Sequence, residues 1–201
     1  MIGVITGDII NSQQSQTEEW LPMLKSFFET LGKTPKDWEI YRGDEFQLKT
    51  GIDDVFWTAM CIKALIKRSE ILDVRLAIGI GDEQFSSEKI TESNGTAYVN
   101  SGRLLNDLKN ENRSFAIQTP DKNITEDLNM IFKWAVINFD AWTAVVSEVV
   151  FEMLLNKKIT QDELAKQLNV TQSSVSQRIK RSYFDLILET DHYYRKKIAT
   201  L

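Results

Sequence analysis

Apolar positions along the first 118 residues alternate or recur in a way that predicts short strands and amphipathic helices. Stretches rich in β-branched and aromatic residues predict strands over 2–6, 38–42, 45–50, 73–80 and 113–118. Helical spacing of apolar residues predicts helices over 15–31, 53–69 and 95–109. The order βαββαβ, followed by a further helix and strand, contains the ferredoxin-like arrangement. We therefore expect an α+β fold with a ferredoxin-like domain over residues 1–120.

The rest of the chain predicts helices without strands. Residues 121–156 are expected to connect two domains, with a short helix inside 119–141 and an apolar helix over 142–156. Residues 157–201 form a second, all-α domain that ends in a helix over 183–197 with a basic end. Tyr193, Tyr194 and the basic residues 195–197 are either contacts to a DNA backbone or an ordinary solvated terminus.

Residues 159–184, ITQDELAKQLNVTQSSVSQRIKRSYF, have the pattern of a helix-turn-helix. Thr160 followed by Glu163 predicts a capping box at the first helix. Asn169 tolerates the left-handed conformation that the turn needs, and Thr171 caps the second helix. The residues expected on the exposed side of that helix suit the major groove of double-stranded DNA: Thr171, Gln172, Ser173, Ser176, Gln177, Lys180 and Arg181. A plain helical hairpin used for packing is the alternative.

Charge is distributed unevenly between the two parts. Residues 157–201 carry nine Lys and Arg against five Asp and Glu, whereas the whole chain has a net charge of −5. A basic terminal segment on an acidic body suggests that only that segment meets a polyanion. Because one DNA-reading module makes few contacts, we expect a homodimer that binds two half-sites, with the Trp142–Leu155 helix as its interface.

Cysteine and histidine content narrows the chemistry. The single cysteine, Cys61, lies in an apolar stretch, which excludes a disulfide framework and a cysteine-rich zinc site. The single histidine, His192, cannot supply a catalytic triad in the first domain. No apolar run approaches the roughly 18 residues of a membrane span, and the N-terminus lacks the basic region of a signal peptide. We expect a cytoplasmic protein without a membrane partner.

Two Gly-Asp segments carry the candidate chemistry of the first domain. ITGDIINS places Asp8 at the end of the first strand, and YRGDEFQL places Asp44 and Glu45 at a hairpin bend. In a ferredoxin-like sheet these carboxylates converge, and converging carboxylates repel unless a cation lies between them. Mg²⁺ or Mn²⁺ held by Asp8, Asp44 and Glu45 is the expected occupant. The alternative is that Gly-Asp is simply favourable turn chemistry at both positions.

These segments resemble known families. TGDIINS, YRGDEFQL, VRLAIGIG and GTAYVNSGRLLNDLK resemble, in order, segments of the palm domain of class III nucleotide cyclases, and the second also resembles the GGDEF signature of diguanylate cyclases. The resemblance implies metal-binding aspartates at Asp8 and Asp44, and ligand-binding groups at Arg42, Asn100 and Arg103. With the helix-turn-helix, the whole chain resembles the SatD family of bacterial proteins.

Several positions depart from the cyclase pattern. Arg42 stands where a GGDEF motif has its first glycine, and Ile40 stands where class III cyclases have a base-reading lysine. Asn100 and Arg103 are three residues apart, whereas the cyclase pair is spaced by four, which turns Arg103 by about 100° around the helix. These departures argue against the usual cyclase chemistry.

Three functions are therefore considered. The first is a DNA-binding, transcription-regulator-like protein whose cyclase-like domain senses a nucleotide or a metal–phosphate ligand. The second is an active metal-dependent nucleotidyl cyclase or transferase, with Asp8, Asp44 and Arg103 as candidate catalytic residues. The third is an interaction protein in which both sites are vestigial.

Overall fold

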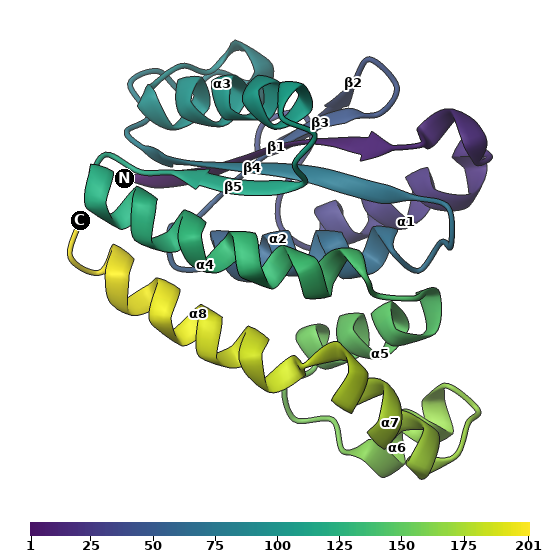
Figure 1. Cartoon of the computed structure of the whole chain (residues 1–201). Coiled ribbons are helices and arrows are strands. Elements are labelled where there is room, and N and C mark those ends of the chain that lie inside the picture. Colours follow the sequence, from purple (N-terminus) through teal and green to yellow (C-terminus); the bar gives the residue numbers. More distant parts are fainter.

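A single mixed sheet and eight α-helices make up the chain. The computed structural model describes residues 1–201, and the elements are arranged as Figure 1 shows. The strands are β1 (Ile2–Ile10), β2 (Trp38–Tyr41), β3 (Glu45–Thr50), β4 (Asp73–Gly81) and β5 (Phe115–Gln118). The helices are α1 (Thr17–Glu29), α2 (Val55–Ile66), α3 (Thr96–Asn110), α4 (Lys122–Asp140), α5 (Ala144–Leu155), α6 (Gln161–Gln167), α7 (Gln172–Ser182) and α8 (Phe184–Ile198). The chain thus has the expected α+β class.

The five strands lie in the order β2-β3-β1-β4-β5. β1 is antiparallel to both β3 and β4, and β5 joins the other side of β4 in parallel. β1 is therefore the central strand, and seven consecutive residues of it are buried. A strand buried from both sides reads as a continuous apolar run with few polar positions, as in IGVITGDII.

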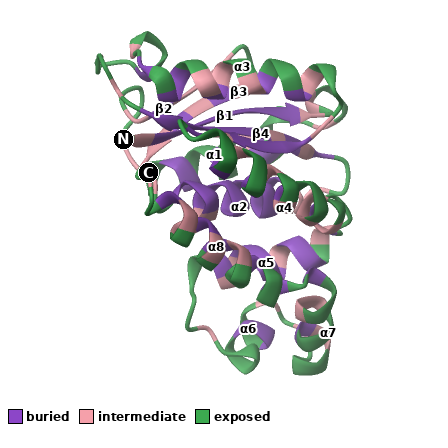
Figure 2. Cartoon of the chain, turned by 60° about the vertical axis from the view of Figure 1, so that its left-hand side comes forward, coloured by how far each residue is buried: buried purple, intermediate pink, exposed green.

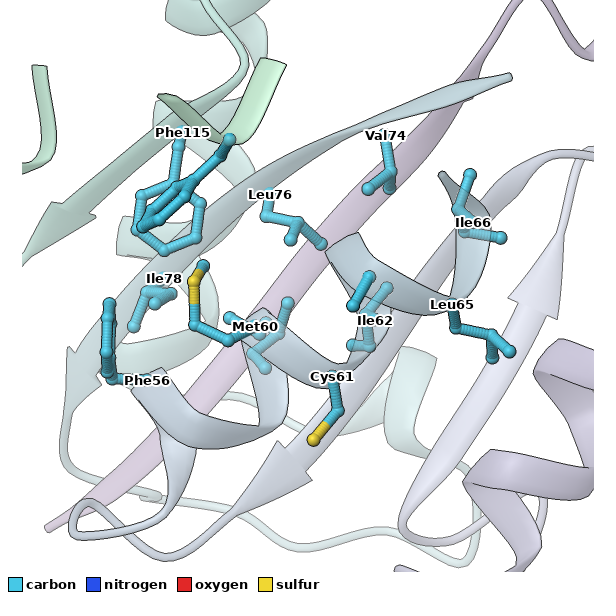
Figure 3. Packing of buried hydrophobic residues seen from close by; sticks show 14 of the residues in the cluster. Phe56, Met60, Cys61, Ile62, Leu65, Ile66, Val74, Leu76, Ile78 and Phe115 are labelled. Atoms are coloured by element: carbon cyan, nitrogen blue, oxygen red, sulfur yellow. The ribbon is translucent and has the colours of Figure 1, made fainter. Parts of the chain in front are cut away.

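Helices cover the two faces of the sheet unequally. In Figure 1, α3 crosses one face, while α1, α2 and α4 lie against the other. The main hydrophobic core lies between the sheet and this second layer, and α2 is buried along almost its whole length. Figure 3 shows Met60 and Ile62 of α2 packed near Leu76 of β4. Cys61 is part of this core, and burial raises the pKa of its thiol to about 12. It is thus the inert apolar residue that the sequence suggests.

Two helices, α4 and α5, differ from the expectation. The short helix expected within 119–141 is the 19-residue helix α4, which begins where the Asp121 side chain accepts a hydrogen bond from Ile124 N–H. The expected dimer surface on Trp142–Leu155 is wrong in its placement, because α5 buries Val146, Val150 and Leu154 in the main core. Figure 2 shows α5 as a largely buried helix between the two ends of the molecule.

The last helix returns to the main body. The sequence groups residues 157–201 as one module, but Phe184, Ile187 and Ile198 of α8 belong to the main core. The Tyr194 ring is fully buried, and its hydroxyl donates a hydrogen bond to Ile52 O at 2.6 Å. Tyr194 is therefore unavailable to DNA. The helices α6 and α7 alone project from the body (Figure 1).

The helices offer no membrane segment: none of them combines the length and the apolar character that crossing a bilayer requires.

Candidate functional site

Asp8 lies at the centre of a charged row across three strands. Its direct cross-strand partners are Glu45 on β3 and Arg75 on β4. Directly paired residues of adjacent strands point to the same face of a sheet, so the three side chains share the face that α3 covers. Asp8 is only 8% exposed. Asp8 therefore lies beside the β2–β3 hairpin, as the order of the predicted elements indicated.

Basic side chains neutralise this row. Arg75 Nη1 lies 3.1 Å from Asp8 Oδ2, and Lys109 Nζ from the end of α3 lies 2.8 Å from Glu45 Oε1 and 3.8 Å from Asp8 Oδ2. Neither cation was foreseen, although Arg75 lies in the segment VRLAIGIG and Lys109 ends the segment GTAYVNSGRLLNDLK. The alternation of polar and apolar residues at the start of β4 does place Arg75 on the polar face of the sheet. This alternation is the one sequence signal for the position of Arg75.

Burial governs the ionisation of Asp8. Desolvation raises the pKa of the Asp8 carboxyl above its usual value, and the nearby Lys109 and Arg75 only partly offset this. The charge of Asp44 raises the Asp8 pKa further. Asp8 Oδ1 is buried and has no hydrogen-bond partner.

Asp44 is held by the chain around it. Ser12 Oγ donates a hydrogen bond to Asp44 Oδ2 at 2.7 Å, and Asp44 O accepts one from Ile9 N–H at 3.1 Å. The hairpin turn that presents Asp44 has both Arg42 and Gly43 at positive φ. A non-glycine residue tolerates this conformation less readily than glycine does, so Gly43 suits its position in the turn better than Arg42, which precedes it, suits its own.

The predicted metal ligands do not gather as a metal centre. No group of three or more His, Cys, Asp or Glu side chains is placed to hold a metal ion. Mg²⁺ and Mn²⁺ favour several oxygen ligands, whereas the oxygens of Asp8, Asp44 and Glu45 contact Arg75, Ser12 and Lys109 instead. The donor set as folded therefore does not fit the expected Mg²⁺ or Mn²⁺.

Of the residues expected to bind a ligand, Arg42 borders this row and Asn100 lies apart from it. Asn100 donates from its amide to Ile80 O at 3.3 Å, at the far end of β4 from Arg75. Five strand residues correspond to roughly 16 Å. Arg103 is exposed on α3, and Arg42 lies at the hairpin tip 3.7 Å from Glu45. Asn100 therefore has a structural contact at the position where the cyclase resemblance implies a ligand-binding group.

The glycine of the TGD segment has a packing explanation. A Cβ on Gly7 would overlap the Phe46 ring and lie 2.7 Å from Arg75 O. Gly7 faces the main core, opposite to Asp8, because side chains alternate along a strand. The glycine thus serves the close packing of Phe46.

The helix pair α6–α7 has the capping that its sequence predicts. Thr160 Oγ1 accepts from Glu163 N–H while the Glu163 carboxylate accepts from Thr160 N–H, which completes the capping box. Asn169 has φ 52° in the turn, and Thr171 accepts from Ser174 N–H at the start of α7. Each local signal therefore produces the expected geometry.

A small core fixes the pair to α5. Leu164, Ala165 and Val175 are buried together with Val149 of α5. Opposite this core, α7 exposes every residue proposed to meet DNA: Thr171, Gln172, Ser173, Ser176, Gln177, Lys180 and Arg181. The pair therefore presents one polar and basic helix face outward.

One ion-pair chain links α7 to the body and was not foreseen. Glu148 of α5 lies between two arginines, with Arg178 Nη1 of α7 at 3.6 Å and Arg68 Nη2 at 3.9 Å. The Arg178 side chain is only 16% exposed. Arg178 therefore attaches α7 to α5, while Lys180 and Arg181 point to solvent.

A comparison with curated proteins finds no match. The model of the SatD family matches residues 2–198, which spans the sheet, the connecting helices and the projecting pair. This match covers nearly the whole chain. The chain belongs to the SatD family.

Proposed function

We propose that this chain is a DNA-binding, transcription-regulator-like protein whose α/β body senses a small ligand. The observation that carries the proposal is the outward face of α7, where seven polar and basic residues stand exposed on a helix that a small core fixes to α5. A helix that presents Gln, Ser, Lys and Arg has the groups that read base edges and phosphates in the major groove.

The position of the pair favours contact with a large partner. The pair α6–α7 projects from the body (Figure 1), and the basic charge is concentrated in the same part of the chain. Double-stranded DNA attracts such a surface through its phosphates, whereas the acidic remainder of the chain is repelled. This difference favours an approach with α7 foremost.

The α/β body supports a distant relation to cyclase palm domains. Its order of elements, β1-α1-β2-β3-α2-β4, is the order of a ferredoxin-like fold. In the nucleotide form of the proposal, phosphates would interact with Arg75 and Lys109. The facing carboxylates of Asp8 and Glu45 oppose this, so the ligand of the body need not be a nucleotide.

A homodimer remains part of the proposal, with a different surface. Met130, Trp134 and Ile137 of α4 are 59%, 72% and 65% exposed. Their spacing of four and three residues puts them on one face of the helix. Asn138 of α4 donates a hydrogen bond to Ser182 O at the end of α7, so a second copy bound at this stripe would lie near the start of α8, which directly follows α7. Such a dimer would present two α7 helices.

A metal-dependent nucleotidyl transferase is the second candidate. The observation in its favour is the buried, unpartnered Oδ1 of Asp8, a free acceptor in a charged site. Against it stand Arg75 and Lys109, which a metal would have to displace. Incubation with Mn²⁺ and each nucleoside triphosphate, with Asp44→Asn as the inactive comparison, distinguishes an enzyme from a sensor.

The test of DNA binding is selection from a pool of random duplexes, followed by fluorescence anisotropy on the enriched sequence. Lys180→Ala should weaken binding and reduce the slope of log K against log salt by about 1. Gln177→Ala should relax the selected sequence without changing that slope. Lys122→Ala, which removes an exposed charge from α4, is the matched control and should leave both unchanged. Failure to enrich any sequence, together with equal salt slopes for all variants, would overturn the proposal.

A further inference from the structure

A pocket of about 390 Å³ lies between α1, the end of α2 and α5. Pockets of roughly 300–1,000 Å³ are the usual size for small-molecule sites. Its apolar wall includes Trp20, Met23 and Leu72, and its charged wall includes Arg68, Glu19 and Glu148. No residue of the charged row around Asp8 lines it, so this is a separate site.

Trp20, on the wall of this pocket, carries an unsatisfied hydrogen-bond donor. The Trp20 side chain is 3% exposed, and its indole Nε1–H is buried without a hydrogen-bond partner. A buried donor without a partner costs about 1–3 kcal/mol of free energy. Most such groups in folded proteins are satisfied. Nε1 has no exposed surface in this state, so a carbonyl or carboxylate of a bound molecule would supply the missing acceptor once the Trp20 ring turns toward the pocket.

The charged wall narrows the ligand class. Arg68 offers a cation, and Glu19 and Glu148 offer two carboxylates. The Arg68–Glu148 separation of 3.9 Å exceeds hydrogen-bond length, so both groups keep donor or acceptor capacity. A simple anion would be repelled by the two carboxylates, and a simple cation would leave Arg68 and Trp20 unmatched. A molecule with an ammonium group, a carboxylate and an apolar side chain matches all three features.

The same glutamate also contacts the proposed DNA-reading helix. Glu148 Oε1 faces Arg68 in the pocket, while Glu148 Oε2 faces Arg178 of α7 at 3.6 Å. An ammonium group bound to Glu148 would compete with Arg178 for the carboxylate. The attachment of α7 to α5 would then weaken, because the Glu148–Arg178 ion pair is the charged contact between these two helices.

We propose that this pocket binds a free α-amino acid with an apolar side chain, and that binding changes the hold of Glu148 on Arg178 and thereby the placement of α7. The proposed binding of the amino acid does not depend on the function of α7. The effect on α7 rests on the proposed DNA-binding function.

The first experiment measures binding by isothermal titration and thermal shift on the full chain, with L-leucine, L-methionine and L-phenylalanine as probes. Two fragments, 3-methylbutylamine and 4-methylpentanoate, each lack one charged group of leucine and should bind at least about tenfold more weakly. Ala144→Trp, which fills the pocket from the first turn of α5, should abolish binding. Arg68→Gln should weaken binding, and this variant provides the test if the tryptophan variant fails to fold.

Glu152→Gln is the matched control, because Glu152 lies one turn beyond Glu148 on α5 and contacts Gln167 instead. It should bind the amino acid as the wild type does. The proposal is overturned if no amino acid raises the midpoint of unfolding at millimolar concentration. It is also overturned if Ala144→Trp and Arg68→Gln both fold and bind the probe unchanged.

The second experiment measures DNA affinity with and without the amino acid. The ligand should change it at least about fivefold, and Glu148→Gln should remove that response. Binding of the amino acid without any change in DNA affinity would overturn the proposed coupling, while the proposed binding site would stand. Absence of DNA binding in every condition, with the amino acid still bound, would overturn the proposed function alone.

Discussion

The side-chain amide of Asn129 pairs with both backbone groups of Ile117. Ile117 N–H donates to Asn129 Oδ1 at 2.9 Å, and Asn129 Nδ2 donates to Ile117 O at 2.7 Å. Ile117 lies on β5, the strand at one edge of the sheet. Unpaired edge strands are templates for aggregation. The Asn129 side chain on α4 therefore makes the hydrogen bonds that a neighbouring strand would make.

Asn129→Leu should lower the free energy of unfolding by roughly 1–3 kcal/mol, because two buried backbone groups lose their partners. It should also promote aggregation on heating, since the edge of β5 becomes free. Urea unfolding and light scattering measure the two effects. Asn106→Leu, at an exposed position of α3, is the control and should be close to neutral in both.

Lys63→Met should destabilise the fold by roughly 3 kcal/mol. Lys63 is 2% exposed, and its Nζ lies 2.6 Å from both Asp73 Oδ1 and Asp140 Oδ1. Removing it leaves two neighbouring carboxylates without their shared cation. The double variant Lys63→Met/Asp140→Asn should recover part of the loss. Equal unfolding midpoints for wild type and Lys63→Met would contradict this account.

Gly7→Ala should cost about 1–3 kcal/mol through overpacking, because its Cβ would lie 2.7 Å from Arg75 O and overlap Phe46. Gly102→Ala is the matched comparison, since nothing lies within 4 Å of a Cβ at that helical position. It should be neutral or stabilise α3 by up to about 1 kcal/mol. If Gly7→Ala is as stable as Gly102→Ala, the packing explanation fails.

Asp8 should make stability fall as pH rises. Burial raises the pKa of the folded-state carboxyl above its unfolded value, so the folded state holds a proton that the unfolded state releases. Its contribution is therefore present below the unfolded pKa and is lost as pH rises through the folded one. Arg75, Lys109, Asp44 and Glu45 face this group.

Urea unfolding at a series of pH values, for wild type and Asp8→Asn, isolates this effect. The stability of wild type relative to Asp8→Asn should decline from the acid side toward neutrality. A difference that rises over the same interval would mean that Arg75 and Lys109 outweigh burial.

Trp134→Glu should convert the proposed homodimer into a monomer, because it places a charge in the exposed stripe on α4. Sedimentation velocity at micromolar concentration gives the answer. Val145→Glu places the same charge on α5, at a residue that is also exposed, and should leave the association unchanged. A wild-type chain that sediments as a monomer would remove the dimer from the proposal.

Local order was readable from the sequence wherever neighbouring residues decide the structure. The capping box of Thr160 with Glu163 and the left-handed turn at Asn169 each depend on residues within a few positions. Their hydrogen bonds form inside one element, so composition and spacing are sufficient to predict them. The exposed face of α7 follows from the same periodicity.

Contacts between distant segments were decided by the tertiary structure. Arg75 and Lys109 occupy the carboxylate row, Glu148 joins Arg68 to Arg178, and Tyr194 is buried against Ile52. Each pairing joins residues tens of positions apart. The sequence around a charged side chain does not indicate which distant residue it will contact. Pairs of carboxylates predicted a metal, but the fold supplied lysine and arginine in its place, because the cations nearest in space arrive on other elements.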